Sequence, residues 1–325
     1  PQKKKQRITL PVSLAKSILS DKEIDIKILW VEASKLLNNK NYSDAIKLFE
    51  RCHDLAPSNE NPLNAIATIY VETNDLASAR EYFIKSLCIL NNQPTIHFIL
   101  GNCNKALSEP RLALQNYTNA LKLDPNYIDA YFHRSIILQD FFDIKAALFD
   151  IDQAIKLCKN KQYLAELLFA KGGMLLDINE RKNALELFDK AIKINPDRRY
   201  RLSKGTALSG LGKNKNEMVT YYKNLIKDFP KFPQAISNLG YIYLDNFDDT
   251  KAEEKFTESL SIDSNNPTVQ NNLAMLQLNR GNFKEGWKNF ESRWLVDPRK
   301  SRFISTNKPL WTIGCSMENK VLIWG

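Results

Sequence analysis

Residues 233–266, PQAISNLGYIYLDNFDDTKAEEKFTESLSIDSNN, contain two short segments with apolar residues at helical spacing, separated by polar residues. The first segment repeats its apolar and small residues at the interval of one helix face: Ile236, Leu239, Gly240 and Tyr243. The second segment does the same with Ala252, Phe256 and Ser259. This stretch therefore predicts a helix–turn–helix hairpin, whose apolar face a neighbouring hairpin has to cover.

The same pattern recurs along most of the 325 residues. Small residues such as Gly101 and Ala120 let paired helices approach closely, and aromatic residues such as Phe49 and Phe83 fill the gap to the neighbouring helix. The interval is 34 residues, except for one of 37, where the three extra residues 162–164 are expected to lengthen a turn. Eight repeats are predicted: 26–59, 60–93, 94–127, 128–161, 165–198, 199–232, 233–266 and 267–300.

The order of these residues resembles the tetratricopeptide (TPR) repeat, which has a period of about 34 residues. The resemblance covers about 275 residues of the chain. It implies an all-α fold, a right-handed superhelix (α-solenoid) of about eight helix–turn–helix repeats. It also implies a protein or peptide partner that binds in the concave groove, as an extended segment.

Both ends of the chain depart from the repeat. Residues 1–25 read as a basic N-terminal arm with a capping helix, and residues 301–325 as a basic linker followed by the apolar run KVLIWG. Such a run is typical of the buried first strand of a nucleotide-binding α/β domain. The end of the chain resembles the junction of bacterial TPR–glycosyltransferase proteins, related to O-GlcNAc transferases and heptosyltransferases, through Gly286, Trp287, Glu291, Arg293, Trp294, Arg302, Pro309 and Trp311. Alternatively, the tryptophans simply cover the last helix.

That second resemblance implies the substrate-recruiting part of a glycosyltransferase, with a truncated catalytic domain beginning near residue 301. The family's catalytic residues have no counterpart here, so no catalytic residue is predicted, and we expect a fragment without enzymatic activity of its own. The alternative is a free-standing assembly or chaperone-like adaptor with no enzyme attached. A weaker alternative is a nucleic-acid-binding solenoid.

Three aromatic residues are the first candidates for peptide binding. Phe98, Phe132 and Phe169 occupy the same position in the first helices of three consecutive repeats. An aromatic stripe there would anchor apolar side chains of a peptide. The same residues would equally suit packing between repeats.

A polar group in the last two repeats is the second candidate. Asn238 and Asn272 share one repeat position, and Tyr241 and Asn271 lie on the same helices. In the similar O-linked N-acetylglucosamine transferases, asparagines at this place bind the backbone of an extended peptide, since one amide offers both a donor and an acceptor. Earlier repeats carry other residues at this position, so the alternative is ordinary surface asparagines.

A basic stretch, 199–232, supplies the third candidate. Its Arg201 and Lys204 fall on a first helix and could hold an acidic peptide or a terminal carboxylate. The alternative is attraction to the acidic repeat that follows, 233–266.

Several functional classes find little support. The cysteines and histidines lack metal-ligand spacing, so neither a metal nor a cofactor is predicted. No apolar run approaches the length of about 18 residues needed to span a membrane, and no signal peptide is apparent, which favours a cytoplasmic protein. The net charge of +9 is spread among many acidic residues, which makes a nucleic-acid partner unlikely.

Overall fold

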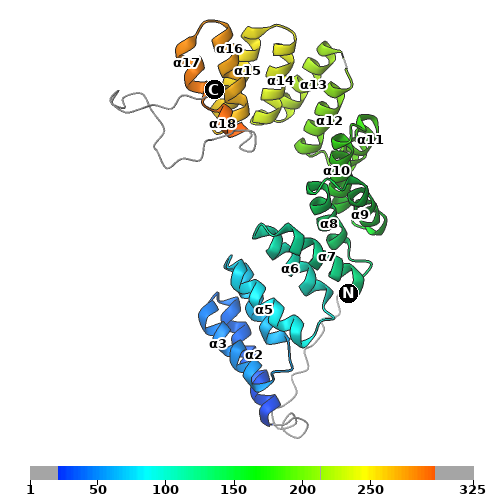
Figure 1. The fold of residues 1–325 in the computed structure, drawn as a ribbon, viewed down its shortest axis with the longest axis vertical. Coiled ribbons are helices and arrows are strands. Elements are labelled where there is room, and N and C mark those ends of the chain that lie inside the picture. The colour runs from blue at the N-terminus through cyan, green and yellow to red at the C-terminus, as the bar shows by residue number, and fades with distance from the viewer. Residues whose placement is uncertain (1–20, 213, 297–325) are drawn as a thin grey trace, which may run out of the picture. The chain divides into compact units, whose positions relative to one another are not determined.

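The computed structural model describes residues 21–212 and 214–296, and within these ranges every regular element is a helix (Figure 1). The predicted N-terminal arm up to residue 20, and the predicted linker and strand at 301–325, lie outside the described residues. The first helices of the hairpins are α2 (Asp21–Asn38), α4 (Asn61–Glu72), α6 (Pro94–Ala106), α8 (Ile128–Asp140), α10 (Lys161–Asp177), α12 (Arg198–Gly210), α14 (Pro233–Asp245) and α16 (Pro267–Asn279). The second helices are α3 (Tyr42–Leu55), α5 (Leu76–Ile89), α7 (Pro110–Leu123), α9 (Ile144–Leu157), α11 (Arg181–Ile194), α13 (Lys215–Asp228), α15 (Asp249–Ile262) and α17 (Phe283–Phe290), and the short α18 (Arg293–Val296) follows.

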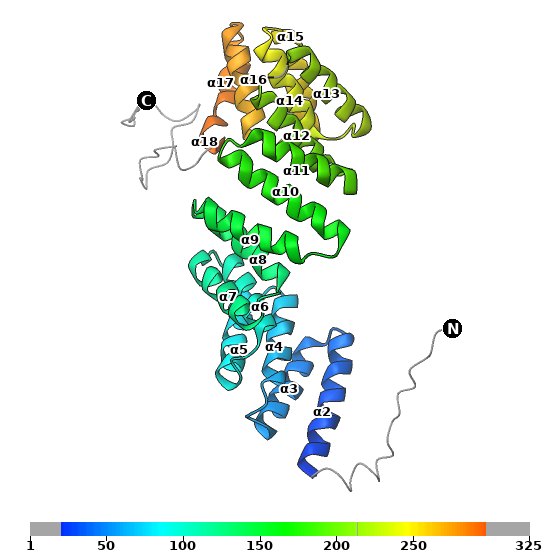
Figure 2. The same cartoon turned by 90° about the vertical axis from the view of Figure 1, so that its right-hand side faces the viewer.

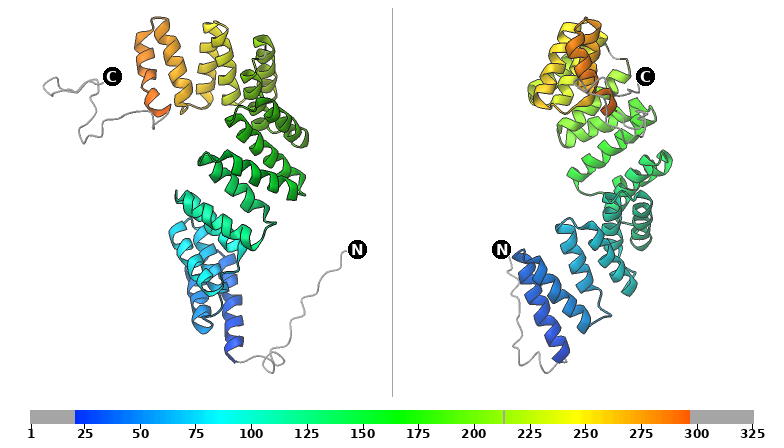
Figure 3. Two further views of the ribbon diagram at one scale, coloured as in Figure 1. Left: turned by 45° about the vertical axis from the view of Figure 1, so that its right-hand side comes forward. Right: turned by 60° about the vertical axis from the view of Figure 1, so that its left-hand side comes forward.

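Successive hairpins pack against one another from α2 to α11 and again from α13 to α17, as in an α-solenoid. Contacts within hairpins, such as α6 with α7, alternate with contacts between them, such as α7 with α8. The chain divides into two compact units, 1–207 and 208–325, with the division inside α12. Within each unit the hairpins stack side by side, as the alternating helices of Figure 2 and the neighbouring ribbons of Figure 3 show.

In three hairpins a glycine of the first helix lies directly against an aromatic ring of the second helix. Gly172 of α10 lies against Phe188 of α11, and Gly240 of α14 lies against Phe256 of α15. A Cβ atom at either glycine would come within 2.5 Å or 2.7 Å of the facing ring. Both rings are fully buried. The sequence therefore places its aromatic residues where only a small partner permits close packing.

The turn inside each hairpin has one residue in the left-handed region. These eight residues have φ between 58° and 78°: Lys40, Asn74, Ser108, Phe142, Asn179, Gly212, Phe247 and Gly281. In most hairpins the next N–H bonds back to a carbonyl five residues earlier, as from Asp143 to Leu138 at 2.9 Å. Asp143 then caps α9 by accepting from the amide of Ala146. The turn ends one helix and starts the next within three residues.

The three extra residues 162–164 do not lengthen a turn, so that prediction is wrong. They lie in α10, which begins at Lys161 and has 17 residues. Asn160 caps the helix there by accepting from the amide of Tyr163. The hydroxyl of Tyr163 donates to Asp129 of α8 at 2.5 Å. The added helical turn is therefore held against the preceding repeat.

The first and last hairpins also differ from the expected boundaries. Helix α2 begins at Asp21, five residues before the predicted start of the first repeat, so residues 21–25 extend its first helix. Helix α17 has 8 residues, whereas the second helices before it have 14. Within the described ranges, none of the helices has both the length and the apolar character needed to cross a membrane.

Candidate peptide-binding face

The first helices α6, α8 and α10 carry a half-buried group of aromatic rings. The rings of Phe98 and His133 lie 5.3 Å apart, those of His133 and Phe132 5.5 Å, and those of Phe132 and Tyr163 6.1 Å. The ring of Tyr127 also lies 5.0 Å from the ring of Phe98. We call this group the aromatic row; it joins three consecutive hairpins through edge-on and tilted contacts.

Phe169, predicted as the third member of the stripe, belongs to a separate cluster. Its ring lies 4.7 Å from Tyr200 and 5.9 Å from Phe188. Phe98, Phe132 and Phe169 are all half-buried, so each ring is fixed on one side by packing and keeps part of its surface open.

His133 adds a titratable group to the aromatic row. Burial lowers the pKa of its imidazole, and the positive charge of Lys105 lowers it further, against a smaller opposing effect of Asp129. The ring is therefore kept neutral and adds a fifth ring to the aromatic row.

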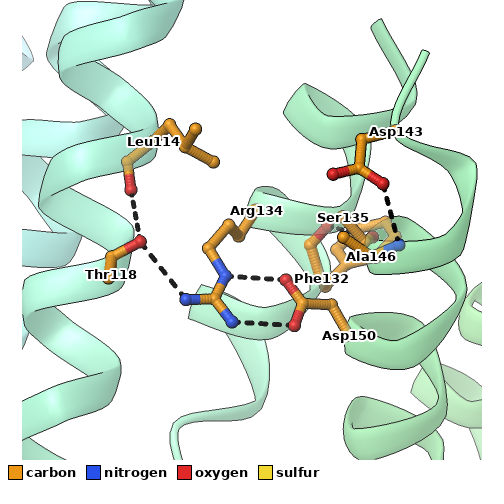
Figure 4. Close-up of polar contacts among 8 residues, drawn as sticks. All are labelled: Leu114, Thr118, Phe132, Arg134, Ser135, Asp143, Ala146 and Asp150. Carbon is orange, nitrogen blue, oxygen red and sulfur yellow. Dashed lines mark hydrogen bonds and ion pairs between the residues drawn. The ribbon is translucent and has the colours of Figure 1, made fainter. Parts of the chain in front are cut away.

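A buried ion pair lies beside the aromatic row and was missed by the sequence analysis. Figure 4 shows Arg134 of α8 between two neighbouring helices. Its guanidinium donates to both carboxylate oxygens of Asp150 on α9, at 2.7 Å and 2.8 Å. It also donates to the hydroxyl of Thr118 on α7 at 3.2 Å. The side chain of Asp150 is only 2% exposed, so Arg134 neutralises a buried charge while it joins three helices.

The residue types at one repeat position could have predicted this ion pair from the sequence. Arg134 stands where neighbouring repeats carry Leu100 and Leu239, and Lys171 stands at the same place in the fifth repeat. Lys171 pairs with Asp152 at 2.6 Å. A cation at a position that carries leucine in three of the eight repeats therefore indicates a nearby carboxylate, which is buried at Asp150 and exposed at Asp152.

The basic candidates on α12 are both half-buried. The ammonium of Lys204 pairs with Asp189 of α11 at 2.5 Å, and Arg201 lies on the same helix. The pairing shows that Lys204 serves contact between neighbouring helices. In the acidic repeat 233–266, Asp248 pairs with Lys251 of its own helix, and Glu253 pairs with Arg280 of the next hairpin.

The polar candidates of the second unit form pairs with tyrosine hydroxyls. The amide of Asn272 on α16 donates to the hydroxyl of Tyr241 on α14. The amide of Asn238 donates to the hydroxyl of Tyr222 on α13 at 3.2 Å. The side-chain oxygen of Asn271 is buried without a hydrogen-bond partner among the described residues. Each paired amide keeps one N–H and its oxygen for further bonds.

No cluster of three or more His, Cys, Asp or Glu side chains that could hold a metal ion occurs in residues 21–212 and 214–296.

Two family models match separate parts of the chain. A tetratricopeptide-repeat model matches residues 165–198, and an Est1 DNA/RNA-binding-domain model matches residues 45–162. A TPR repeat-containing protein of Methanocaldococcus jannaschii is 24% identical over 83% of this chain and 51% of its own length. The UDP-N-acetylglucosamine–peptide N-acetylglucosaminyltransferase of Giardia intestinalis is 22% identical over 47% of this chain and 10% of its own length. The chain thus spans about half, or less, of the length of these relatives.

Solved structures share the fold. A tetratricopeptide repeat protein from Parabacteroides merdae superposes with a TM-score of 0.59 at 15% identity, over 78% of this chain and 99% of that one. The stacked hairpins, the small–aromatic pairs and the matched repeat agree with this similarity. The chain therefore has the fold of a tetratricopeptide-repeat solenoid, and its residues 165–198 match the model of that repeat.

Proposed function

We propose that the chain is a protein-interaction scaffold whose first helices bind an extended polypeptide segment. The observation that supports it most is the half-exposed state of Phe98 and Phe132 on α6 and α8. Rings that packing already holds lose little conformational freedom on binding, which favours affinity. Half-exposed aromatic side chains at regular intervals suit apolar anchors of a peptide that lies across the hairpins.

The asparagines of the second unit support the same mode of binding. The amides of Asn238 and Asn272 are oriented by tyrosine hydroxyls and retain donor and acceptor capacity. A polypeptide backbone offers the complementary acceptor and donor once per residue. The second unit would therefore contact the backbone of a polypeptide segment that it binds.

A peptide-array screen followed by titration of a selected peptide tests this function. We expect Phe132→Ala combined with Phe169→Ala to weaken binding at least about tenfold, because two anchor surfaces are lost. Phe149→Ala on α9 is the matched control, since Phe149 is 60% exposed on a second helix. Circular dichroism of the wild type, the double variant and the Phe149→Ala control distinguishes a loss of binding from a loss of folding. If helicity and melting temperature fall together with affinity, the two rings are core residues and the proposal fails.

A glycosyltransferase is the parent protein that we propose for this scaffold. The junction-like residues around Gly286 and Trp287 support it, as does the similarity to the Giardia enzyme. The reading frame beyond residue 325 tests it: a glycine-rich turn after KVLIWG, and nucleotide-sugar hydrolysis by the whole protein, are expected. A stop codon there would instead favour the free-standing adaptor.

Nucleic-acid binding is the second candidate, because the Est1 model matches residues 45–162. The charge of that stretch opposes it. It contains twelve Lys and Arg against thirteen Asp and Glu, which gives a net charge of −1. Phosphate binding depends on an excess of positive charge and falls steeply with salt. Polyanion binding that weakens strongly from low to moderate salt would favour this candidate over the peptide scaffold.

A further inference from the structure

Phe142 has a backbone conformation that its residue type disfavours. It occupies the left-handed position of the α8–α9 turn with φ of 61°, and its side chain is 88% exposed. A side chain with a Cβ atom costs free energy in this region, and asparagine or glycine costs less. The corresponding turns use Asn74, Asn179, Gly212 and Gly281, but also Lys40, Ser108 and Phe247. The ring of Phe247 lies 6.0 Å from the ammonium of Lys215, whereas the ring of Phe142 has no aromatic or cation–π partner among the described residues, so it is open to a binding partner.

A pocket lies beside this turn, on the edge of the first unit formed by the hairpin turns. It has a volume of about 270 Å³ and is lined by Glu109, Pro110, Arg111, Leu112 and Phe141. Leu112 and Phe141 are 45% and 40% exposed although both are large and apolar. Pockets for small-molecule ligands usually measure about 300–1,000 Å³. This smaller pocket fits one or two apolar side chains of a peptide better than a whole metabolite.

The charges around the pocket favour an acidic partner. Glu109 is neutralised by Arg80, whose guanidinium lies 2.6 Å from its carboxylate. Arg111 is exposed, and no ion pair joins it to another described residue. Among the residues that line the pocket, the apolar walls are therefore joined by one exposed cation, Arg111.

We propose that this pocket docks a linear peptide segment in which a large apolar side chain stands next to a carboxylate. The apolar side chain fills the space between Leu112 and Phe141, the carboxylate pairs with Arg111, and Phe142 covers the docked segment. This site lies on the turn edge of the solenoid, away from the aromatic row, and it is independent of the peptide-binding function proposed for the first helices.

An array of synthetic peptides with a fixed Leu-Asp or Leu-Lys core and randomised flanks tests the proposal on the full chain. The wild-type protein is expected to retain Leu-Asp peptides. Arg111→Glu should weaken that retention at least about tenfold and shift the preference to Leu-Lys peptides, because the rim charge is reversed. Lys182→Glu is the matched control, since Lys182 is exposed at the second residue of α11, as Arg111 is in α7. Equal effects of Arg111→Glu and Lys182→Glu would overturn the proposal.

Phe142→Asn separates binding from stability. Asparagine suits the left-handed turn, so the melting temperature should rise by about 1–3 °C. Retention of Leu-Asp peptides should nevertheless fall. Phe247→Asn, in the second unit, relieves the same strain at a residue that is 93% exposed, and it should raise the melting temperature without affecting retention. Undiminished retention by the Phe142→Asn and Leu112→Ser variants would overturn the proposal.

Discussion

At the scale of single residues, the ion pair between Arg134 and Asp150 departs most clearly from the repeat pattern. Asp150→Ala would leave the guanidinium of Arg134 in a site where only 19% of that side chain is exposed. Removing one partner of a buried pair costs about 3–5 kcal/mol, much of it from the charge left behind. We therefore expect the free energy of unfolding to fall by about 3 kcal/mol, measured by urea denaturation of the full chain.

The double variant Arg134→Leu with Asp150→Leu is the control for that prediction. Other repeats carry Leu100 at the position of Arg134 and Leu187 at the position of Asp150. Replacing both charges by apolar side chains leaves no buried charge, so the double variant should be close to wild type in stability. If the double variant is as unstable as Asp150→Ala, the pair stabilises the fold through its geometry and not through charge compensation.

At the scale of helices, repeat spacing predicted most of the hairpins but not their ends. The interval of 34 residues locates Ala252 and Phe256 correctly in a buried small–aromatic pattern. Spacing alone could not tell whether residues 162–164 extend a turn or a helix. That outcome depends on the amide of Tyr163 donating to the N-cap side chain of Asn160, and on the hydroxyl of Tyr163 donating to Asp129 of α8, a contact between two helices.

The sequence likewise predicted only part of the candidate binding face. The repeat register predicted that Phe98 and Phe132 occupy equivalent positions on first helices, where both are half-buried, and their role in peptide binding stays a prediction. The register did not predict the hydrogen bonds of Asn238 and Asn272 to tyrosine hydroxyls, because Tyr222 and Tyr241 lie on neighbouring helices at separations that no single repeat fixes. Contacts between repeats are tertiary, so one sequence constrains them only weakly.

Two adjacent glycines of α10 provide the prediction for helix packing. A Cβ atom at Gly172 would lie 2.5 Å from the buried ring of Phe188, whereas one at Gly173 would meet nothing within 4 Å. Gly172→Ala should destabilise the protein by about 1–3 kcal/mol, because the ring has no room to move. Gly173→Ala should stabilise it by up to about 1 kcal/mol, because alanine favours the helix. Thermal unfolding of both variants measures the signs, and destabilisation of equal size would show that α10 needs both glycines.

At the scale of the whole molecule, stability should be distributed along the chain instead of being shared by one core. Among the described residues, the larger contacts between hairpins join hairpins that are adjacent in the sequence, so the loss of one contact should open the structure locally. Asp150→Ala is expected to accelerate amide hydrogen exchange in α7, α8 and α9 by about a hundredfold, which corresponds to roughly 3 kcal/mol. Exchange in α14 and α15 of the second unit should stay unchanged. Uniform acceleration in all of these helices would instead mean that the hairpins unfold as a single cooperative body.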